Sequence, residues 1–188
     1  MNETDGQNCK TLVVALYAGP GSGKSRTMAG VYSELKWLDV NAEMAPEYAK
    51  EKVWEKSFAV LGNQIYVFGK QLHTIKRVAG QVDVVVTDSP LLLSLIYGEN
   101  QVPEFRPLVL AANAQFRTLN FFLRRKNKFN PSGRMQNEAE SRKIDERIEE
   151  LLKDLEVPFE YVDADRDSIK KIVDRVMLEL DTIKTDGV

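Results

Sequence analysis

The stretch Thr11-Leu-Val-Val-Ala-Leu-Tyr-Ala-Gly-Pro-Gly-Ser-Gly-Lys-Ser25 decides the fold. Its first part, residues 11–17, is a nearly continuous run of apolar and β-branched residues, which is typical of a strand buried on both faces of a parallel sheet. Glycines follow at once, and beyond Lys24 the apolar residues Met28, Val31 and Leu35 recur at helical spacing up to residue 38. The stretch therefore predicts a strand, a glycine-rich loop and a helix in direct succession.

The loop between this strand and helix has the composition of a site for the phosphate groups of a nucleotide. Glycines let successive backbone N–H groups turn inward, and the following helix points its positive end at the same place. Lys24 is expected to reach the β- and γ-phosphates, and the Ser25 hydroxyl to ligate Mg²⁺. Ala18 stands where the strict motif has Gly, a small departure because the Gly-Lys-Ser ending is intact. The residues expected to bind the nucleotide here are Gly19, Pro20, Gly21, Ser22, Gly23, Lys24, Ser25 and Arg26.

The rest of the chain continues the alternation of strands and helices. After the first unit, further strands are expected at 40–44, 82–87, 118–123 and 158–162, and helices at 47–58, 64–78, 91–96, 104–116, 138–155 and 165–180. The polar ends 1–10 and 181–188 are expected to be flexible tails, which leaves one domain over 11–180. Strands that alternate with helices predict an α/β fold with a parallel sheet.

Composition argues against several classes of protein. With 26 Lys and Arg against 28 Asp and Glu, the formal charge is -2, so nucleic acid or an anionic membrane would need a local basic patch. The apolar stretches are shorter or more polar than the roughly 20 residues of a membrane span. A single cysteine, Cys9, cannot form an internal disulfide, and the start of the chain lacks signal-peptide features. We expect a cytoplasmic protein with no membrane partner, and the sequence indicates no oligomeric state.

Nucleotide-driven machines, GTP switches and kinases all use such a loop. An AAA-type machine usually carries a second acidic residue after the strand Asp and further subdomains, whereas Ser89-Pro90 follows Asp88 in this short chain. A GTP switch reads guanine with an Asn-Lys-x-Asp loop. The nearest match, residues 127–130, ends in Asn, which lacks the two carboxylate acceptors that guanine requires. These patterns favour a kinase.

A basic segment supports the same class. Residues 117–143 hold eight Lys or Arg and two Glu, and they flank a Pro- and Gly-containing loop at about 124–137. Phosphoryl transfer needs positive charge around the migrating phosphate and exclusion of water, which a basic lid supplies. The alternative is a solvated surface loop. Within the lid, Arg134 is the first candidate for a γ-phosphate contact, followed by Arg124 and Arg142.

Two carboxylates are candidates to serve the acceptor hydroxyl. Asp88 ends a buried strand on the side where parallel sheets place their ligands, so it can hold a water of Mg²⁺ or accept the hydroxyl proton. The alternative is an N-cap for the next helix, a role that better suits Ser89. Glu47 follows the second expected strand. It is a weaker candidate because Glu is common in a first helical turn.

The order of these motifs resembles the small P-loop kinases typified by the ribosylnicotinamide kinase domain. The matching segments, spread over about residues 11–180, are Gly-x-Gly-Lys-Ser25, Pro46-Glu-Tyr-Ala-Lys50, Val85-Val-Thr-Asp-Ser-Pro90 with a downstream Tyr97, Gly133-Arg134 and Tyr161-Val-Asp163. The resemblance implies a five-stranded parallel sheet with helices on both faces, ATP as donor, an acceptor site between the second and third strands, and an arginine lid. It also implies that Glu47 and Asp88 face the acceptor, and that the 163–166 loop, with Asp165 and Arg166, lies near adenine.

The acceptor is open at this point. The family usually has Arg where this chain has Lys50, and Lys cannot form the bidentate fork. A free nucleoside such as ribosylnicotinamide is one acceptor. Similar viral kinases phosphorylate the hydroxymethyl group of a modified pyrimidine in DNA (5-hydroxymethyluracil type), and a non-catalytic ATP-binding partner protein is a third possibility. In a DNA kinase, four aromatic residues would stack a base, although packing in the protein core is the favoured role of these residues. The four are Trp54, Phe58, Tyr66 and Phe68.

Overall fold

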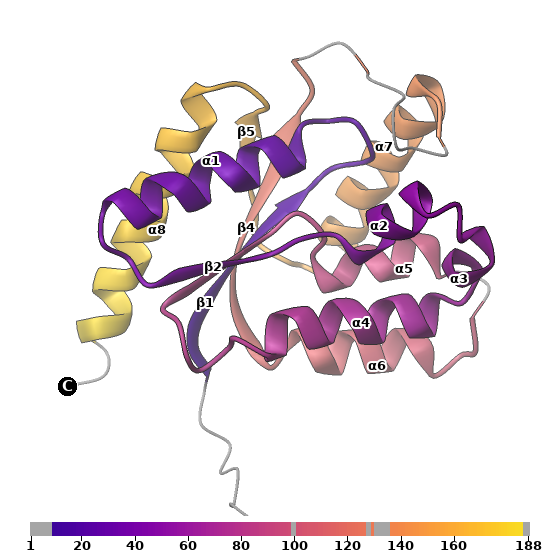
Figure 1. Cartoon of the computed structure of the whole chain (residues 1–188), viewed down its shortest axis with the longest axis horizontal. Coiled ribbons are helices and arrows are strands. Elements are labelled where there is room, and N and C mark those ends of the chain that lie inside the picture. Colours follow the sequence, from indigo (N-terminus) through magenta and orange to yellow (C-terminus); the bar gives the residue numbers. More distant parts are fainter. Residues whose placement is uncertain (1–8, 99–100, 127–128, 130–135, 186–188) are drawn as a thin grey trace, which may run out of the picture.

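Five parallel strands form a single sheet in the described part of the computed structural model, which comprises residues 9–98, 101–126, 129 and 136–185 (Figure 1). The strand order is β2-β3-β1-β4-β5, and all four neighbouring pairs are parallel. The strands are β1 (Cys9–Tyr17), β2 (Ala42–Ala45), β3 (Val84–Thr87), β4 (Phe116–Arg124) and β5 (Glu160–Asp163). The predicted α/β fold with a five-stranded parallel sheet is confirmed.

Helices cover both faces of this sheet (Figure 1). They are α1 (Lys24–Trp37), α2 (Tyr48–Trp54), α3 (Phe58–Gly62), α4 (Gln64–Lys76), the 3₁₀ turn η1 (Leu91–Leu93), α5 (Ser94–Tyr97), α6 (Phe105–Asn113), α7 (Glu138–Asp154) and α8 (Asp167–Thr185). Helices α1 and α8 pack on one face, whereas α4, α5, α6 and α7 contribute to the core on the other. Within the described ranges, no helix combines the length and apolar character needed to cross a bilayer.

The central strand β1 explains the apolar run that opens the sequence. Residues 11–18 are each at most 4% exposed. Leu12, Val14 and Leu16 point into the core under α1 and α8. Val13 and Tyr17 point into the opposite core. Because both faces of β1 are buried, the strand needs apolar residues at every position rather than at alternate ones.

Several element boundaries differ from the sequence-based expectation. The helix expected at 47–58 ends at Trp54, because Lys56 adopts a left-handed φ of 55° and its N–H bonds to the Val53 carbonyl. A separate short helix that was not expected, α3, follows at Phe58–Gly62. The last helix continues to Thr185, past the expected end of the domain at 180, and β1 already begins at Cys9.

The register of the strands brings the candidate residues to one edge of the sheet. Thr87 at the end of β3 pairs with Ala15 of β1 on one side and with Ala45 of β2 on the other. The segments that follow these three strands therefore begin side by side. They contain the phosphate loop, Glu47 and Asp88.

Candidate functional site

The phosphate loop curls between the end of β1 and the start of α1. Gly21 and Gly23 have φ values of 76° and 110°, a conformation that favours glycine. Lys24 is only 8% exposed, and its ammonium donates hydrogen bonds to the carbonyls of Ala18 at 2.7 Å and Gly19 at 3.2 Å. Burial lowers the pKa of Lys24, opposed by the nearby carboxylates. The Lys24 ammonium is thus buried against the backbone carbonyls of the phosphate loop.

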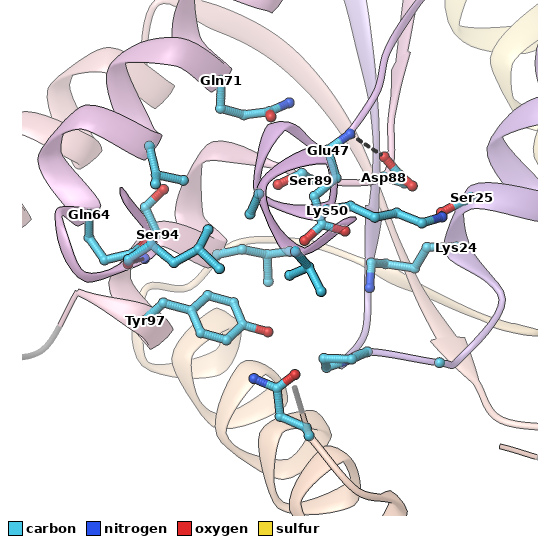
Figure 2. A pocket seen from close by; sticks show the side chains of 18 of the residues that line it. Lys24, Ser25, Glu47, Lys50, Gln64, Gln71, Asp88, Ser89, Ser94 and Tyr97 are labelled. Carbon is cyan, nitrogen blue, oxygen red and sulfur yellow. Dashed lines mark hydrogen bonds between the residues drawn. The ribbon is translucent and has the colours of Figure 1, made fainter. Parts of the chain in front are cut away.

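Asp88 and Glu47 lie next to each other beside this loop (Figure 2). Asp88 is 2% exposed, and its carboxylate accepts the backbone N–H of Glu47 at 3.0 Å. No side chain caps η1, so the alternative in which Asp88 is the N-cap of the following helix is wrong. Instead, Asp88 fixes the start of α2, where Glu47 is the N-cap residue. Two carboxylates therefore meet where the ends of β2 and β3 face Lys24.

A pocket of about 730 Å³ begins at the phosphate loop and extends between α2, α3, α4 and α5 (Figure 2). This volume is typical of small-molecule sites, which span about 300–1,000 Å³. At the loop end the lining includes Lys24, Ser25, Arg26, Glu47 and Asp88. At the far end the lining is mostly apolar with a few polar groups: Val53, Phe58, Leu61, Val67, Leu93, Gln64, Gln71, Ser94 and Tyr97. One cavity thus joins a phosphate-binding end to an apolar chamber.

Lys50 and Ser25 meet at the loop end of this pocket. The Lys50 ammonium donates to the Ser25 hydroxyl oxygen at 3.3 Å, which leaves that oxygen a further lone pair. A second pocket of about 180 Å³ is also lined by Lys50, together with the exposed Trp54. The Ser25 hydroxyl and the Asp88 carboxylate are oxygen donors of the kind that Mg²⁺ prefers, and Mg²⁺ usually keeps several waters. Among the described residues, no group of three or more His, Cys, Asp or Glu is arranged to hold a metal ion.

The structure places several other predicted residues away from the pocket. Arg124 forms an ion pair with Asp163 at 3.0 Å, and Arg142 pairs with Glu138 along α7 at 2.8 Å. Asp165 accepts the Ser168 N–H at 3.1 Å in the first turn of α8. The pocket lining does not include Arg124, Arg142, Asp165 or Arg166. Arg134 lies outside the described residues.

Arg26 connects two predicted parts of the nucleotide site. Its guanidinium donates to the Ala164 carbonyl at 2.9 Å, so it ties the beginning of α1 to the 163–166 loop. Arg26 also lines the pocket. The resemblance places the 163–166 loop near adenine, and this contact holds that loop against α1, the helix that follows the phosphate loop.

Three residues beside the phosphate loop escaped the sequence analysis: Arg125, Ser141 and Asp145, here called the loop clamp. Asp145 accepts the Gly19 N–H at 2.6 Å and forms an ion pair with Arg125. Arg125 donates to the Pro20 carbonyl at 2.8 Å and to the Ser141 hydroxyl at 2.8 Å. The Ser141 hydroxyl donates to the Pro20 carbonyl as well. The only sequence signal was the basic cluster, which did not separate Arg125 from its neighbour Arg124.

The four aromatic residues considered for base stacking divide into two groups. Phe68 is 3% exposed and packs edge-on against Phe105, as core packing predicts. Trp54, Phe58 and Tyr66 are exposed, which contradicts the core role for these three. Phe58 lines the pocket. The helices α2, α3 and α4 therefore present aromatic surface to solvent.

Tyr97 belongs to the pocket as well, and its side chain points into it (Figure 2). The residue as a whole is 41% exposed, but desolvation of the phenol, with Glu47 and Asp145 nearby, raises the pKa of Tyr97. The phenol therefore stays protonated at neutral pH and can donate a hydrogen bond into the pocket.

Solved structures with this fold include the NadR protein and a deoxyadenosine kinase. The NadR protein in complex with NR aligns with a TM-score of 0.59 and 16% identity, over 84% of this chain and 44% of NadR. The present chain therefore spans less than half of the length of NadR. Deoxyadenosine kinase from M. mycoides with bound dATP aligns with a TM-score of 0.53 and 20% identity, over 90% of this chain and 99% of the kinase. The chain thus has the fold of a P-loop kinase. No curated protein matches it in sequence.

A family model described as an AAA domain matches residues 13–170. This match corrects the expectation that set AAA-type proteins aside because Ser89 follows Asp88: the family admits this chain without a second carboxylate at that position. Since the matched region runs from β1 into α8, the chain belongs to this AAA domain family.

Proposed function

We propose that the protein is a Mg-ATP-dependent kinase that transfers the γ-phosphate to a hydroxyl group of a nucleoside-like acceptor. One observation carries the proposal: a single pocket joins the phosphate loop, two adjacent carboxylates and an apolar chamber that contains amide and hydroxyl groups. A motor ATPase has no need of such a chamber beside its phosphate site. A kinase needs one, because the acceptor must lie against the phosphate that it receives.

The loop end supplies the groups that hold a triphosphate. The inward N–H groups of the loop and the Lys24 ammonium would bind the phosphates, and Ser25 and Asp88 would hold Mg²⁺. Magnesium, when bound, neutralises charge that develops between the phosphates. Lys24 must then leave the carbonyls of Ala18 and Gly19, to which it donates in this structure. Binding of ATP exchanges these two neutral acceptors for anionic ones, which favours the charged amine.

A carboxylate at the junction would take the proton that the acceptor hydroxyl loses as its oxygen receives the phosphoryl group. Asp88 and Glu47 both line the pocket at this place, so each is a candidate for the base. Asp88 is the more buried of the two, and its carboxylate is already oriented by the Glu47 N–H. Among the lid arginines, Arg134 remains our candidate to stabilise the phosphoryl group in transfer.

The far end of the pocket has the chemistry of a base-binding chamber. Apolar side chains would contact the faces of a planar heterocycle, and Gln64, Ser94 and Tyr97 offer hydrogen bonds to its polar edge. Two proteins of the same fold were solved with NR and with dATP, which supports a nucleoside-like ligand. A free nucleoside such as ribosylnicotinamide is therefore our first choice of acceptor.

A modified pyrimidine in DNA is the second candidate acceptor, and the pocket beyond Lys50 favours it. That pocket is lined by Ser25, Glu47, Lys50 and Asp88, as is the main one, and it is also lined by Trp54, which is 63% exposed. An acceptor longer than a nucleoside has room to continue past Lys50, where Trp54 can stack a neighbouring base.

The test is transfer of labelled γ-phosphate from ATP to two sets of acceptors. One set holds free nucleosides including ribosylnicotinamide, and the other holds DNA with hydroxymethylpyrimidines. We expect label on a free nucleoside and none with the Lys24→Ala control. Label on DNA alone would identify the DNA kinase. ATP binding with no transfer to any acceptor would contradict the kinase proposal and would favour a non-catalytic ATP-binding protein.

A further inference from the structure

The backbone of the phosphate loop poses an electrostatic problem at its first turn. A loop that binds anions must present N–H groups to them and turn its carbonyl oxygens away. Three consecutive carbonyls, those of Ala18, Gly19 and Pro20, each have a donor in this structure. Lys24 donates to the first two, and Arg125 and Ser141 donate to the third.

These donors differ in whether they can stay in place when a nucleotide binds. Lys24 lines the pocket, and in the proposed function its ammonium leaves the loop carbonyls for the phosphates. None of the three clamp residues lines the pocket. The clamp can therefore hold Gly19 and Pro20 while Lys24 moves.

The close packing at Gly19 supports the inference that the loop clamp stays on the loop while Lys24 moves. A Cβ at position 19 would lie 2.6 Å from the Ser141 carbonyl oxygen and 3.1 Å from both the Arg125 guanidinium and the Asp145 carboxylate. Contacts below 3.0 Å to backbone atoms force the structure to shift. Glycine at this position of the loop is thus required by the approach of α7, whereas Gly21 and Gly23 are required by their left-handed φ angles.

Arg125 and Asp145 are also more buried than charged residues on a protein surface usually are. Their side chains are 8% and 16% exposed. The guanidinium reaches Asp145, Pro20 and Ser141 at once, which uses its rigid fork of donors. A lysine keeps the charge but cannot make these contacts together.

We propose that Arg125, Ser141 and Asp145 are positioning residues for ATP, which hold the first turn of the phosphate loop in its binding conformation and so make α7 part of the nucleotide site. The inference rests on the proposed function only in that the loop must bind ATP; it does not depend on the acceptor. Without the clamp, ATP binding must itself order Gly19 and Pro20, and this cost appears as weaker binding.

The experiment measures the Kd of Mg-ATP by calorimetry, without acceptor, together with the Tm of each variant. Arg125→Lys is expected to raise the Kd about tenfold, because it loses hydrogen bonds of a charged donor. The matched control is Arg117→Lys. It makes the same substitution in β4, the strand that ends one residue before Arg125. Arg117 pairs with Glu179 at 2.9 Å and does not line the pocket. This control is expected to keep the wild-type Kd, whatever it does to the Tm.

Transfer kinetics provide a second readout. Arg125→Lys is expected to raise the KM for ATP and to keep kcat at saturating ATP, since the clamp does not touch the reacting atoms. If Arg125→Lys fails to fold, Ser141→Ala replaces it as the test variant. Because Ser141→Ala loses one neutral hydrogen-bond donor, we expect its Kd for Mg-ATP to rise about threefold. An unchanged Kd in the folded clamp variant would overturn the inference and leave the kinase proposal intact. A wild-type protein that binds no ATP would overturn both.

Discussion

The two sides of the main pocket are built in different ways. On the phosphate-loop side, buried pairs hold the backbone: Lys24 on Ala18 and Gly19, and the loop clamp on Gly19 and Pro20. On the acceptor side, α2 and α3 contain no buried residue, and Phe58 and Trp54 face solvent. The difference indicates that the proposed donor site is fixed by the fold, whereas the proposed acceptor site is lined by short helices without buried residues.

The largest effect should follow a change on the fixed side. Lys24→Ala removes the charge that would bind the phosphates, and we expect phosphoryl transfer to fall by about 10³-fold, the range seen when a group that stabilises the transition state is lost. A transfer assay with the best acceptor measures this, and the Tm shows that the variant is folded. Full activity in a folded variant would contradict the mechanism.

The next effect concerns the junction between the two sides. Of Asp88→Asn and Glu47→Gln, the variant that lacks the base should lose about 10²-fold in kcat, the lower end of the range for general-base catalysis. The other should lose less. The kcat of each variant, measured with saturating ATP and acceptor, separates them. Losses below tenfold in both variants would show that neither carboxylate is the base.

A smaller effect is expected on the acceptor side. Phe58→Ala removes an aromatic wall of the chamber, and we expect the KM for the acceptor to rise about tenfold with no change in the KM for ATP. Trp54→Ala is the matched control, because Trp54 lines only the second of the two pockets. Loss of activity in Trp54→Ala with DNA but not with free nucleosides would favour the DNA acceptor. A parallel rise in the KM for ATP in Phe58→Ala would contradict the independence of the two sides.

The smallest effect is on stability at alkaline pH. Tyr17 is 1% exposed at the end of β1, and burial raises its pKa above the ordinary value of 10.0. Above pH 10 the unfolded chain loses this proton first, so the free energy of unfolding falls by up to about 1.4 kcal/mol per pH unit. Tyr17→Phe lacks this contribution, and its stability should fall less steeply from pH 10 to 11 while the pH dependence below 9 is unchanged. Urea unfolding at several pH values measures both slopes, and equal alkaline slopes would contradict the assignment.

The sequence was sufficient where the controlling interactions are local. The β1 strand, the phosphate loop and α1 follow from one uninterrupted stretch, and the parallel register then places Asp88 beside the loop. The break between α2 and α3 was not predictable from composition, because it occurs at Lys56 without Gly or Pro.

The same limit applies to the basic segment. Arg124 and Arg125 are equivalent in the sequence, but successive residues near the end of a strand point to opposite sides. Arg124 consequently pairs with Asp163 and Arg125 with Asp145. Which arginine reaches the phosphate loop depends on where α7 lies relative to β4, and no local pattern encodes that placement.

The bond between the Gly19 N–H and Asp145 has a consequence for the nascent protein. The two residues are 126 positions apart. At a synthesis rate of about 5–20 residues per second, the ribosome needs on the order of 6–25 s to make the chain between them. During that interval the residues of the loop have been made, but their partner in α7 has not. Translation order therefore delays assembly of the complete nucleotide site until the chain has been made as far as Asp145.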